Sequence, residues 1–348
     1  MADFNAQIDA VIAWVDGNDP EHIRKRRNII LTEGDNDRLE VPTGRDTTRF
    51  ADNGELEYCI RSIRAFAPWI RTIHLVTDNQ VPRFLTPEIR RELNVHLVDH
   101  RQIFAGFNFA IPTFNTRTIE TALWRIPGLA DHYIYFNDDF ILTGDVVPSD
   151  FFDAGKVVLR GEWNSIVTYG PLRLELNRLY SLAVKKLLGI TRSTHLLLQM
   201  KSARLAGSHN RYFRVPHVPH PVRTRTLERF FSRHPELFEQ NIRYRFRSTG
   251  QFSAIFLAHH LEINRNMAVL LPPDEHVMIN GEMDTAAGLK RKLNRIRHRH
   301  ARFVCLQGFE YFRDDQQRQI RQILDDIIGE REKTPASGLG IELFTLDA

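Results

Sequence analysis

Two adjacent acidic residues follow an apolar segment near the middle of the sequence. His132 to Phe136 reads HYIYF and runs directly into Asn137, Asp138 and Asp139. Carboxylate oxygens suit Mg²⁺ and Mn²⁺, and such a cation can neutralise the charge of a diphosphate. The sequence therefore predicts metal ligands at Asp138 and Asp139. The alternative is an ordinary polar loop, in which paired aspartates are common.

A second acidic turn lies near the N-terminus, where the apolar run from Ile8 to Val15 ends. It reads Asp16-Gly17-Asn18-Asp19-Pro20. Glycine lets a ligand approach the backbone closely, so Asp16 and Asp19 could bind a nucleotide or a metal. A structural role is equally compatible, because Asp19 could cap the helix that Pro20 begins.

Histidine and arginine residues gather between Val215 and Arg225 (VPHVPHPVRTR) and between Arg243 and Ser248 (RYRFRS). Phosphoryl transfer needs a group that takes a proton from the acceptor hydroxyl and cations that hold the phosphoryl oxygens, and His with Arg supplies both. His217 and His220 could instead ligate a metal, although no Cys or carboxylate accompanies them. A basic surface loop with solvated histidines is the structural alternative.

A basic segment, Lys290 to Arg302 (KRKLNRIRHRHAR), contains seven Lys or Arg residues. It predicts a solvated face. Attachment to the inner face of the cell membrane is a further hypothesis, because each basic residue contributes about 1 kcal/mol near anionic lipid. No aromatic residues are interleaved with it, which speaks against single-stranded nucleic acid as a partner.

Buried strands alternating with helices must position these groups. The predicted strands cover 8–15, 73–77, 94–98 and 132–136. Helices are expected after Pro20 and over 55–66, 119–124, 172–190 and 253–261, and an amphipathic helix is expected over 316–328 near the C-terminus. This alternation predicts an α/β fold with a largely parallel sheet. Ligands of such sheets gather beyond the carboxyl ends of the strands, where Asp16, Asp78 and Asp138 fall.

Composition sets the outer limits of the prediction. The chain has 348 residues, is 42% hydrophobic and carries a formal net charge of +4, which suits a packed globule that mildly favours anionic partners. Two cysteines, Cys59 and Cys305, cannot form a disulfide framework. No run approaches the roughly 20 apolar residues that span a bilayer, and Met1 to Gln7 lacks a signal-peptide pattern. A cytoplasmic protein is expected.

Several of these segments together resemble the Stealth family, which includes bacterial capsule polymerases and the animal lysosomal-enzyme GlcNAc-1-phosphotransferase. The similar segments are IDAVIAWVDGNDP, Arg49 to Pro82, Ile111 to Leu142, HVPHPV and the RFRS at Arg245 to Ser248. A fourth block near Arg302 to Phe309 departs from the family pattern. Gln307 and Gly308 stand where the family usually has Asn-Asp, so this chain lacks that carboxylate.

The resemblance implies a GT-A-like (Rossmann-like) nucleotide-sugar fold with a helical insertion or lid. The expected divisions are a nucleotide-sugar-binding part over 1–150, a helical insertion over 151–208, the rest of the catalytic domain over 209–330 and a tail over 331–348. The resemblance also implies a UDP-sugar donor such as UDP-HexNAc, an oligosaccharide or polysaccharide acceptor, and Mg²⁺ or Mn²⁺. By motif position it makes Asp16, His217 and Arg247 catalytic candidates, and it places Asp52, Asn53 and Glu55 in the DNGEL element. The remaining substrate-binding candidates are Asp19, Asp78, Asn115, His220 and Arg245.

The resulting hypothesis is transfer of a hexose-1-phosphate to a sugar hydroxyl, which builds a phosphodiester-linked capsular or exopolysaccharide. His217 would accept the proton of the hydroxyl, Arg223 and Arg247 would hold the phosphoryl oxygens, and Asp138 with Asp139, or Asp16, would hold the cation. Two alternatives remain: a glycosyltransferase of the same fold that releases a nucleoside diphosphate, and a non-catalytic polyanion-binding protein. Nucleic acid is not an expected partner.

Overall fold

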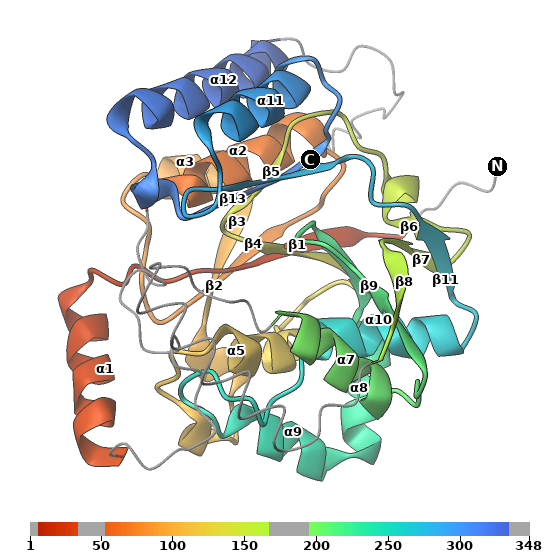
Figure 1. The fold of residues 1–348 in the computed structure, drawn as a ribbon. Coiled ribbons are helices and arrows are strands. Elements are labelled where there is room, and N and C mark those ends of the chain that lie inside the picture. Colours follow the sequence, from red (N-terminus) through yellow and green to blue (C-terminus); the bar gives the residue numbers. More distant parts are fainter. Residues whose placement is uncertain (1–5, 34–52, 167–194, 334–348) are drawn as a thin grey trace, which may run out of the picture.

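A five-stranded sheet forms the centre of the protein, as seen in a computed structural model that describes residues 6–33, 53–166 and 195–333 (Figure 1). Its strand order is β10-β4-β1-β2-β3. The strands are β1 (Ile8–Ala13), β2 (Ile73–Thr77), β3 (Val95–Asp99), β4 (His132–Asn137) and β10 (His220–Arg223). The first four are parallel, and β10 runs antiparallel to β4. The predicted α/β fold with a largely parallel sheet is confirmed.

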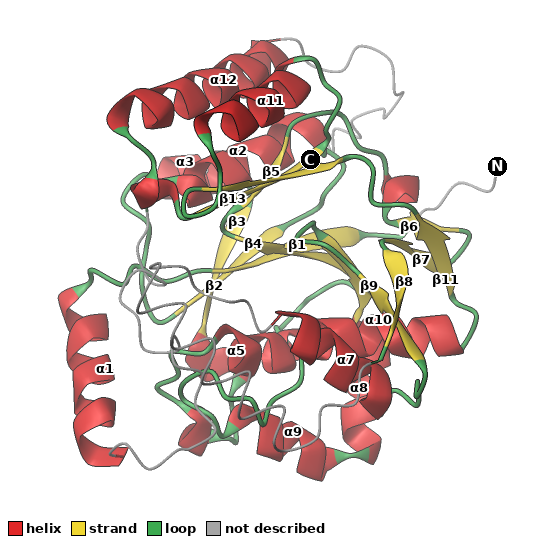
Figure 2. Cartoon of the chain, viewed as in Figure 1, coloured by secondary structure: helices red, strands yellow, loops and turns green. Residues whose placement is uncertain are grey.

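Helices cover both faces of this sheet (Figure 2). On one side lie α2 (Glu55–Phe66), α11 (Ala286–Arg297) and α12 (Asp314–Lys333). On the other side lie α5 (Thr116–Ala122), α7 (His195–Leu205), α8 (Thr224–Arg233), α9 (Pro235–Ile242) and α10 (Ala254–Asn264). The remaining helices are α1 (Pro20–Glu33), α3 (Pro87–Glu92) and α4 (His100–Ile103), with short 3-10 turns at Asn108–Ala110, Leu123–Arg125, Pro148–Asp150 and Phe309–Tyr311.

The alternation of side chains along β1 explains these two layers. Ile8, Ala10 and Ile12 join the core beneath α2 and α12, whereas Val11 and Ala13 join the core formed with α5, α8 and α10. Successive side chains of a strand point to opposite faces, so an all-apolar strand must be covered on both sides. Five of the six residues of β1 are apolar and all six are buried, which requires the three-layer arrangement.

Three smaller sheets flank the central one. They consist of β12 (His276–Asn280), β13 (Phe303–Gln307) and β5 (Phe140–Leu142); β11 (Ala268–Leu271), β7 (Lys156–Arg160) and β6 (Phe152–Asp153); and β8 (Glu162–Ser165) with β9 (Arg211–Arg214). The structure thus differs from the expected helical insertion over 151–208, because this region opens with strands that pair with later parts of the chain. The helix predicted at 172–190 lies outside the described residues.

One buried carboxylate ties the amino-terminal edge of the sheet together. Asp9 of β1 is 0% exposed, and its oxygens accept hydrogen bonds from the guanidinium of Arg71 at 2.8 and 2.6 Å, from His74 Nε2 at 3.2 Å and from the Ala130 N–H at 2.9 Å. Burial alone would raise the pKa of Asp9, but these hydrogen bonds hold it well below its usual value. The carboxylate therefore links β1, β2 and the turn that leads into β4.

Replacing this carboxylate should destabilise the whole sheet. We expect Asp9→Asn to lower the free energy of unfolding by about 3 kcal/mol, because the amide cannot satisfy the buried donors that now meet a charged acceptor. Urea unfolding would measure the change. Asp153→Asn, at an exposed aspartate of β6, is the matched control and should stay within about 0.5 kcal/mol. Equal stability of the two variants would contradict the role of Asp9.

Candidate functional site

Polar groups converge at the carboxyl end of β4. Asn137 ends this strand, and Asp138 and Asp139 form the turn into β5. Because β10 is antiparallel to β4, with His220 opposite Tyr135, the chain that enters β10 lies beside this same end. His217 belongs to that entering segment, and its ring lies 6.4 Å from the ring of Phe140. The structure thus brings together the predicted base and the predicted metal ligands.

The Asp139 side chain is half-buried and incompletely hydrogen-bonded. Its Oδ2 accepts a hydrogen bond from the Cys305 Sγ at 3.5 Å, while its Oδ1 is buried without a partner among the described residues. Burial raises the pKa of Asp139 to about 6, although hydrogen bonds from Cys305 and Gln307 act in the opposite direction. A buried polar atom without a partner is rare in native proteins, so this oxygen is suited to a cation or a ligand donor.

The surroundings of Asp139 limit how a metal could bind. Within the described ranges, no group of three or more His, Cys, Asp or Glu side chains is arranged to hold a metal ion. Mg²⁺ is commonly held by one or two carboxylates together with substrate phosphates. Asp138 and Asp139 fit that kind of shared site rather than an all-protein cage.

Arg247 is a guanidinium close enough to this acidic turn to interact with its charges. Its Nη2 donates to Thr116 Oγ1 at 3.3 Å. Burial lowers the pKa of Arg247, and the carboxylates of Glu120, Asp139 and Asp138 act against this lowering. Its charge therefore faces the acidic groups at the end of β4.

Glu120 is a second buried acid of the site that the sequence analysis did not single out. Its carboxylate accepts from Ser253 Oγ at 3.1 Å and from Tyr135 OH at 3.4 Å. Burial raises the pKa of Glu120, whereas Ser253 and Arg247 act to lower it. The only sequence signal was an acidic residue within the predicted helix at 119–124, which alone suggests a solvated face.

The loop that carries Arg247 is held by buried amides. Asn115 Nδ2 donates to the carbonyl oxygens of Tyr244 and Phe246 at 3.0 and 2.8 Å and to Gln251 Oε1 at 2.8 Å. Its Oδ1 accepts from the Arg117 N–H, so Asn115 also caps α5. Asn115, a predicted substrate-binding residue, thus has a positioning role in the structure.

His217 stacks on another histidine. The ring centroids of His195 and His217 lie 4.2 Å apart with an interplanar angle of 28°. Burial, followed by the charges of His195, His276 and Arg247, lowers the pKa of His217 to about 3. Its imidazole is therefore neutral at pH 7 and keeps a lone pair that can accept a proton.

Both His195 and the nearby Gln199 belong to α7, and they hold the segment that carries His217. Gln199 Nε2 donates to the Val215 carbonyl at 2.8 Å and lies 2.6 Å from His195 Nε2, and Gln199 Oε1 accepts from the Val215 N–H at 2.9 Å. The main chain two residues before His217 is thereby fixed. The sequence analysis missed His195, because a single histidine before the apolar run LLL indicates no partner.

Two residues of the same sequence block lie elsewhere. His220 is 4% exposed and packs against Tyr135, Phe256 and His259 in the core. Arg223 pairs with Glu262 and stands opposite His132, at the start of β4. At about 3.3 Å per residue, His132 lies roughly 16 Å along β4 from Asn137. The structure therefore separates Arg223 from His217 and Arg247.

The polar residues after β1 and β2 form their own hydrogen-bonded groups. Asp16 exchanges two main-chain hydrogen bonds of 2.9 Å with the Gln80 amide. Asp19 Oδ1 accepts from the His22 N–H at 2.8 Å, which is the helix-capping role weighed for it above. Asp78 forms an ion pair with Lys25 at 2.9 Å.

The start of α2 also approaches the site. The Glu55 carboxylate accepts from the Asn53 N–H at 2.7 Å and lies close enough to Asp139 to raise its pKa. Asp52 lies outside the described residues.

Arg245, another predicted substrate-binding residue, donates to the Pro112 carbonyl at 2.6 Å.

The altered fourth block lies directly beside the acidic turn. Gln307, at the end of β13, hydrogen-bonds to Asp139, and the neighbouring Leu306 N–H donates to the Asp139 carbonyl at 2.9 Å. Gly308 adopts a left-handed conformation with φ of 62°. A Cβ added at Gly281 would lie 2.0 Å from the Gly308 carbonyl oxygen, so these two turns pack backbone against backbone.

This fold and site define an α/β protein in which carboxylates, a neutral imidazole and a guanidinium gather near the carboxyl end of β4. Stealth protein CR1, conserved region 1, matches residues 6–30, and Stealth protein CR2, conserved region 2, matches residues 49–159. The chain belongs to the Stealth family.

Three curated relatives illustrate the match. Exopolysaccharide phosphotransferase SCO2594 of Streptomyces coelicolor is 30% identical over 256 residues, which cover 73% of this chain and 38% of the relative. Exopolysaccharide phosphotransferase cps2G of Lactiplantibacillus plantarum is 38% identical over 42% of this chain and 39% of the relative. Capsular polysaccharide phosphotransferase fcs1 of Haemophilus influenzae is 29% identical over 76% and 68%. The chain thus spans about two fifths of the first two relatives.

Solved structures give a weaker likeness. The galactosyltransferase LgtC, solved with donor and acceptor sugar analogs, is 14% identical with a TM-score of 0.40 over 92% of this chain and 95% of its own. The glycosyltransferase GlyE of Streptococcus pneumoniae is 13% identical with a TM-score of 0.38 over 94% and 64%. At these TM-scores the likeness supports no functional conclusion.

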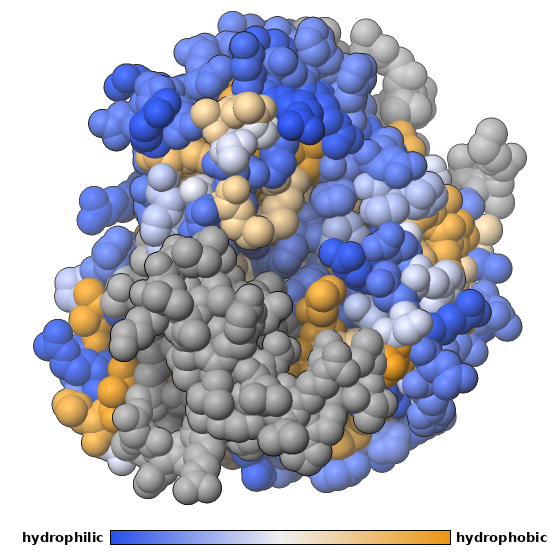
Figure 3. Space-filling view, viewed as in Figure 1, coloured by the Kyte–Doolittle hydropathy of each residue, from blue (hydrophilic) through white to orange (hydrophobic). Residues whose placement is uncertain are grey.

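The basic segment Lys290 to Arg302 forms much of α11 and the turn after it. The surface of this part of the protein is largely hydrophilic (Figure 3). Part of its charge is paired, since Lys292 contacts Asp284 at 2.5 Å and Arg299 contacts Glu330 at 3.1 Å. In the ranges that the structure describes, no helix is long and apolar enough to cross a membrane. Peripheral attachment stays a prediction that binding to anionic vesicles at low salt would test.

Acid should destabilise this protein through its buried histidines. Burial lowers the pKa of His100 and His195 to about 4 and of His217 and His259 to about 3. Below about pH 6.5 these histidines take up a proton in the unfolded chain but not in the folded one. Each of them therefore lowers the free energy of unfolding by about 1.4 kcal/mol for each pH unit of acidification. The raised pKa values of Asp139, about 6 against 3.8 in the unfolded chain, and of Glu120 oppose this loss of stability, but they are two acids against four histidines.

We therefore expect the free energy of unfolding to fall steadily between pH 6.5 and pH 4.5 in urea titrations. His259→Asn should reduce the slope, whereas His298→Ala, at an exposed histidine, should leave it unchanged. A stability that is level across this range would contradict the neutral state of the buried imidazoles.

Proposed function

We propose that this chain transfers a sugar-1-phosphate, with HexNAc-1-phosphate from a UDP-sugar as the expected group, to a sugar hydroxyl. The product is a phosphodiester-linked capsular polysaccharide or exopolysaccharide. The observation that carries the proposal is a neutral His217 near both Arg247 and the Asp138-Asp139 turn at the end of β4. The curated relatives are named as exopolysaccharide or capsular polysaccharide phosphotransferases, which agrees with this chemistry.

His217 is the proposed general base. A ring nitrogen would accept the proton of the acceptor hydroxyl as its oxygen attacks phosphorus, while the bond from phosphorus to the nucleotide oxygen breaks. With only the protein's own groups around it, this imidazole has a pKa of about 3 and is a weak base. A bound diphosphate would stabilise the imidazolium by its negative charge and raise that pKa toward the working pH.

Arg247 would hold the oxygens of the transferred phosphoryl group. A guanidinium offers several donors in one plane, which suits phosphate oxygens. Glu120 lies close enough to oppose the pKa shift of Arg247, and Ser253 and Tyr135 fix the Glu120 carboxylate in turn. Glu120 is therefore a positioning residue that keeps the guanidinium turned toward the site.

Asp138 and Asp139 would hold Mg²⁺ or Mn²⁺ together with the donor diphosphate. The buried Asp139 Oδ1 that lacks a partner among the described residues supports this assignment. Such an ion neutralises charge that develops on the leaving nucleotide. Gln307 and Gly308 beside this turn supply no further carboxylate.

The released nucleotide separates this proposal from its alternatives. We would incubate the purified protein with UDP-, CDP- and GDP-sugars, Mg²⁺ and oligosaccharide acceptors, and separate the nucleotides by chromatography with and without EDTA. We expect UMP, and only when both metal and acceptor are present. Release of UDP would identify a glycosyltransferase, and salt-sensitive polymer binding without any release would favour a polyanion-binding protein.

Replacing the proposed base should reduce turnover and spare donor binding. We expect His217→Ala to lower kcat by about 10²–10⁴-fold, the usual contribution of general base catalysis. The dissociation constant of the UDP-sugar, measured by calorimetry, should change little, because the imidazole acts on the acceptor. His298→Ala is the control and should keep the full rate. A His217→Ala protein with near-normal kcat would exclude this residue as the base.

A further inference from the structure

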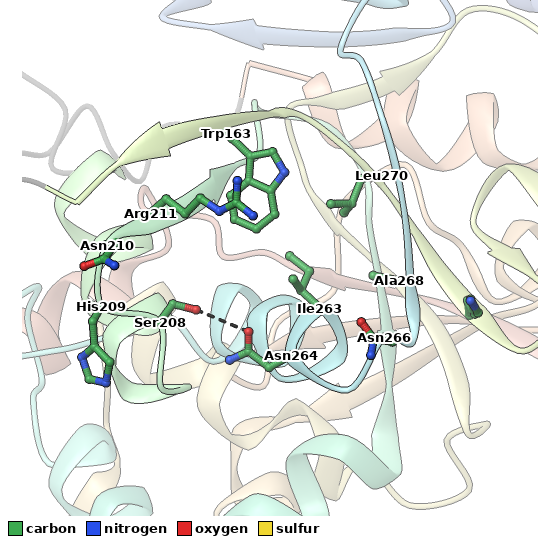
Figure 4. Close-up of a pocket in the computed structure, with 11 residues that line it drawn as sticks. Trp163, Ser208, His209, Asn210, Arg211, Ile263, Asn264, Asn266, Ala268 and Leu270 are labelled. Carbon is green, nitrogen blue, oxygen red and sulfur yellow. Dashed lines mark hydrogen bonds between the residues drawn. The ribbon is translucent and has the colours of Figure 1, made fainter.

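A polar pocket lies away from the proposed catalytic residues, between β8, β9, β11 and the end of α10 (Figure 4). Its volume is about 650 Å³. Ile263 and Asn264 reach it from the carboxyl-terminal end of α10, and Trp163 and Arg211 reach it from the paired strands β8 and β9. Nothing in the proposed reaction uses these side chains.

An aromatic ring and a guanidinium form one wall of this pocket. The Arg211 guanidinium carbon lies 4.2 Å from the centroid of the Trp163 ring. Trp163 is 40% exposed, and its ring also meets Phe213 edge-on at 5.5 Å. In the part of the chain that the structure describes, Arg211 has no ion pair. A cation–π contact thus holds an available guanidinium at the rim.

Amide side chains and a second cation line the rest of the pocket. Asn264 accepts from Ser208 Oγ at 3.5 Å and donates to the Ala206 carbonyl at 2.7 Å, which orients its amide, as Figure 4 shows in part. Asn210 and Asn266 add two further amides, and Lys156 adds a charge. Among the described residues, the lining includes no Asp or Glu.

This combination indicates the chemistry of the ligand. Amide groups hydrogen-bond to hydroxyls as both donor and acceptor, and an exposed Trp offers an apolar face to the C–H groups of a sugar ring. Two cations in a lining that includes no acid favour a negative charge. Single-stranded nucleic acid is less well matched, because it relies on several aromatic rings on which successive bases stack, whereas one Trp reaches this pocket.

We propose that this pocket is a second glycan-binding site, which holds an anionic sugar unit of the acceptor chain at a distance from the reacting hydroxyl. The inference rests on the proposed function for the identity of the glycan as acceptor. The binding itself depends only on the pocket.

The fold connects this pocket to the catalytic residues through two elements. Helix α10 begins next to Ser253, which hydrogen-bonds to Glu120, and ends at Asn264 in the pocket. At about 1.5 Å per residue, its 11 residues span roughly 16 Å. Strand β9 leads from Arg211 to the segment that carries His217. A bound chain would therefore reach across several sugar units, which favours long acceptors over short ones.

Direct binding tests this proposal without any assay of turnover. The probes are a phosphodiester-containing mannan, the same mannan after removal of its phosphate, and a uronic-acid oligosaccharide, each titrated by calorimetry. We expect the two anionic probes to bind and the neutral mannan to bind at least about tenfold more weakly. Preference between the anionic probes identifies the charge as phosphodiester or carboxylate.

Variants locate the binding. Arg211→Gln and Asn266→Asp should each weaken binding of the preferred anionic probe by about tenfold or more. Asp tolerates the left-handed conformation of Asn266, whose φ is 57°, so the fold should survive. The matched control is Arg229→Gln, at an exposed arginine of α8, which should bind like the unmodified protein. Thermal unfolding of each variant checks its stability.

Several results would overturn the proposal. These are failure of the unmodified protein to bind either anionic probe, binding of the neutral mannan as tight as that of the anionic probes, and variants that bind normally. Displacement of the mannan by a single-stranded oligonucleotide would identify a nucleic-acid site instead. If mannan binds as expected but no donor releases UMP, the pocket stands and the proposed reaction fails, so the two hypotheses remain distinguishable.

Discussion

Two buried amide side chains, Asn115 and Gln251, hold together the segments on which the candidate site depends. Each amide has two donors and a carbonyl acceptor, and leaving any of them unpaired in the interior would cost free energy. Asn115 binds the carbonyls of residues 244 and 246, and Gln251 binds Thr118 Oγ1 and the Asn241 carbonyl at 3.1 and 3.0 Å. The loop that carries Arg247 can therefore adopt few other positions relative to α5. The position of the proposed catalytic Arg247 thus depends on hydrogen bonds made by amides elsewhere in the interior.

Much of the central sheet could be predicted because its strands carry the full signal in their own residues. The strands predicted at 73–77 and 94–98 match β2 and β3, and the amphipathic helix predicted near the C-terminus matches α12, with Ile320 and Leu324 buried. Strand β10 was missed, because a short segment that contains Pro221 and a histidine reads as a loop. Proline fits there because β10 is an edge strand, which only the assembled sheet reveals.

Residues of the candidate site could be predicted where their chemistry and their place in the sequence both pointed to a site. They could not be predicted where the direction of a strand or helix determines the position of the residue in the fold. The Asp138-Asp139 turn and His217 were singled out by their chemistry, and the structure brings them near each other because one follows β4 and the other precedes β10, which lies beside it. Arg223 is only six residues from His217, yet β10 carries it to the far end of the sheet. His195 and Glu120 come from helices whose orientation no local pattern encodes. Asp19 shows the converse, because its position before Pro20 indicated a cap from sequence alone.

The opposite pKa shifts of Asp139 and His217 have a consequence for the resting charge of the site. In water an aspartate loses its proton well before a histidine does. Here the order is reversed, with values of about 6 and about 3. Over the interval between them a proton resides on the carboxyl while the imidazole remains bare, so these two groups form no internal zwitterion. Above about pH 6 the carboxyl ionises while the imidazole stays neutral, so at neutral pH Asp139 and His217 together carry one negative charge, which suits a cation.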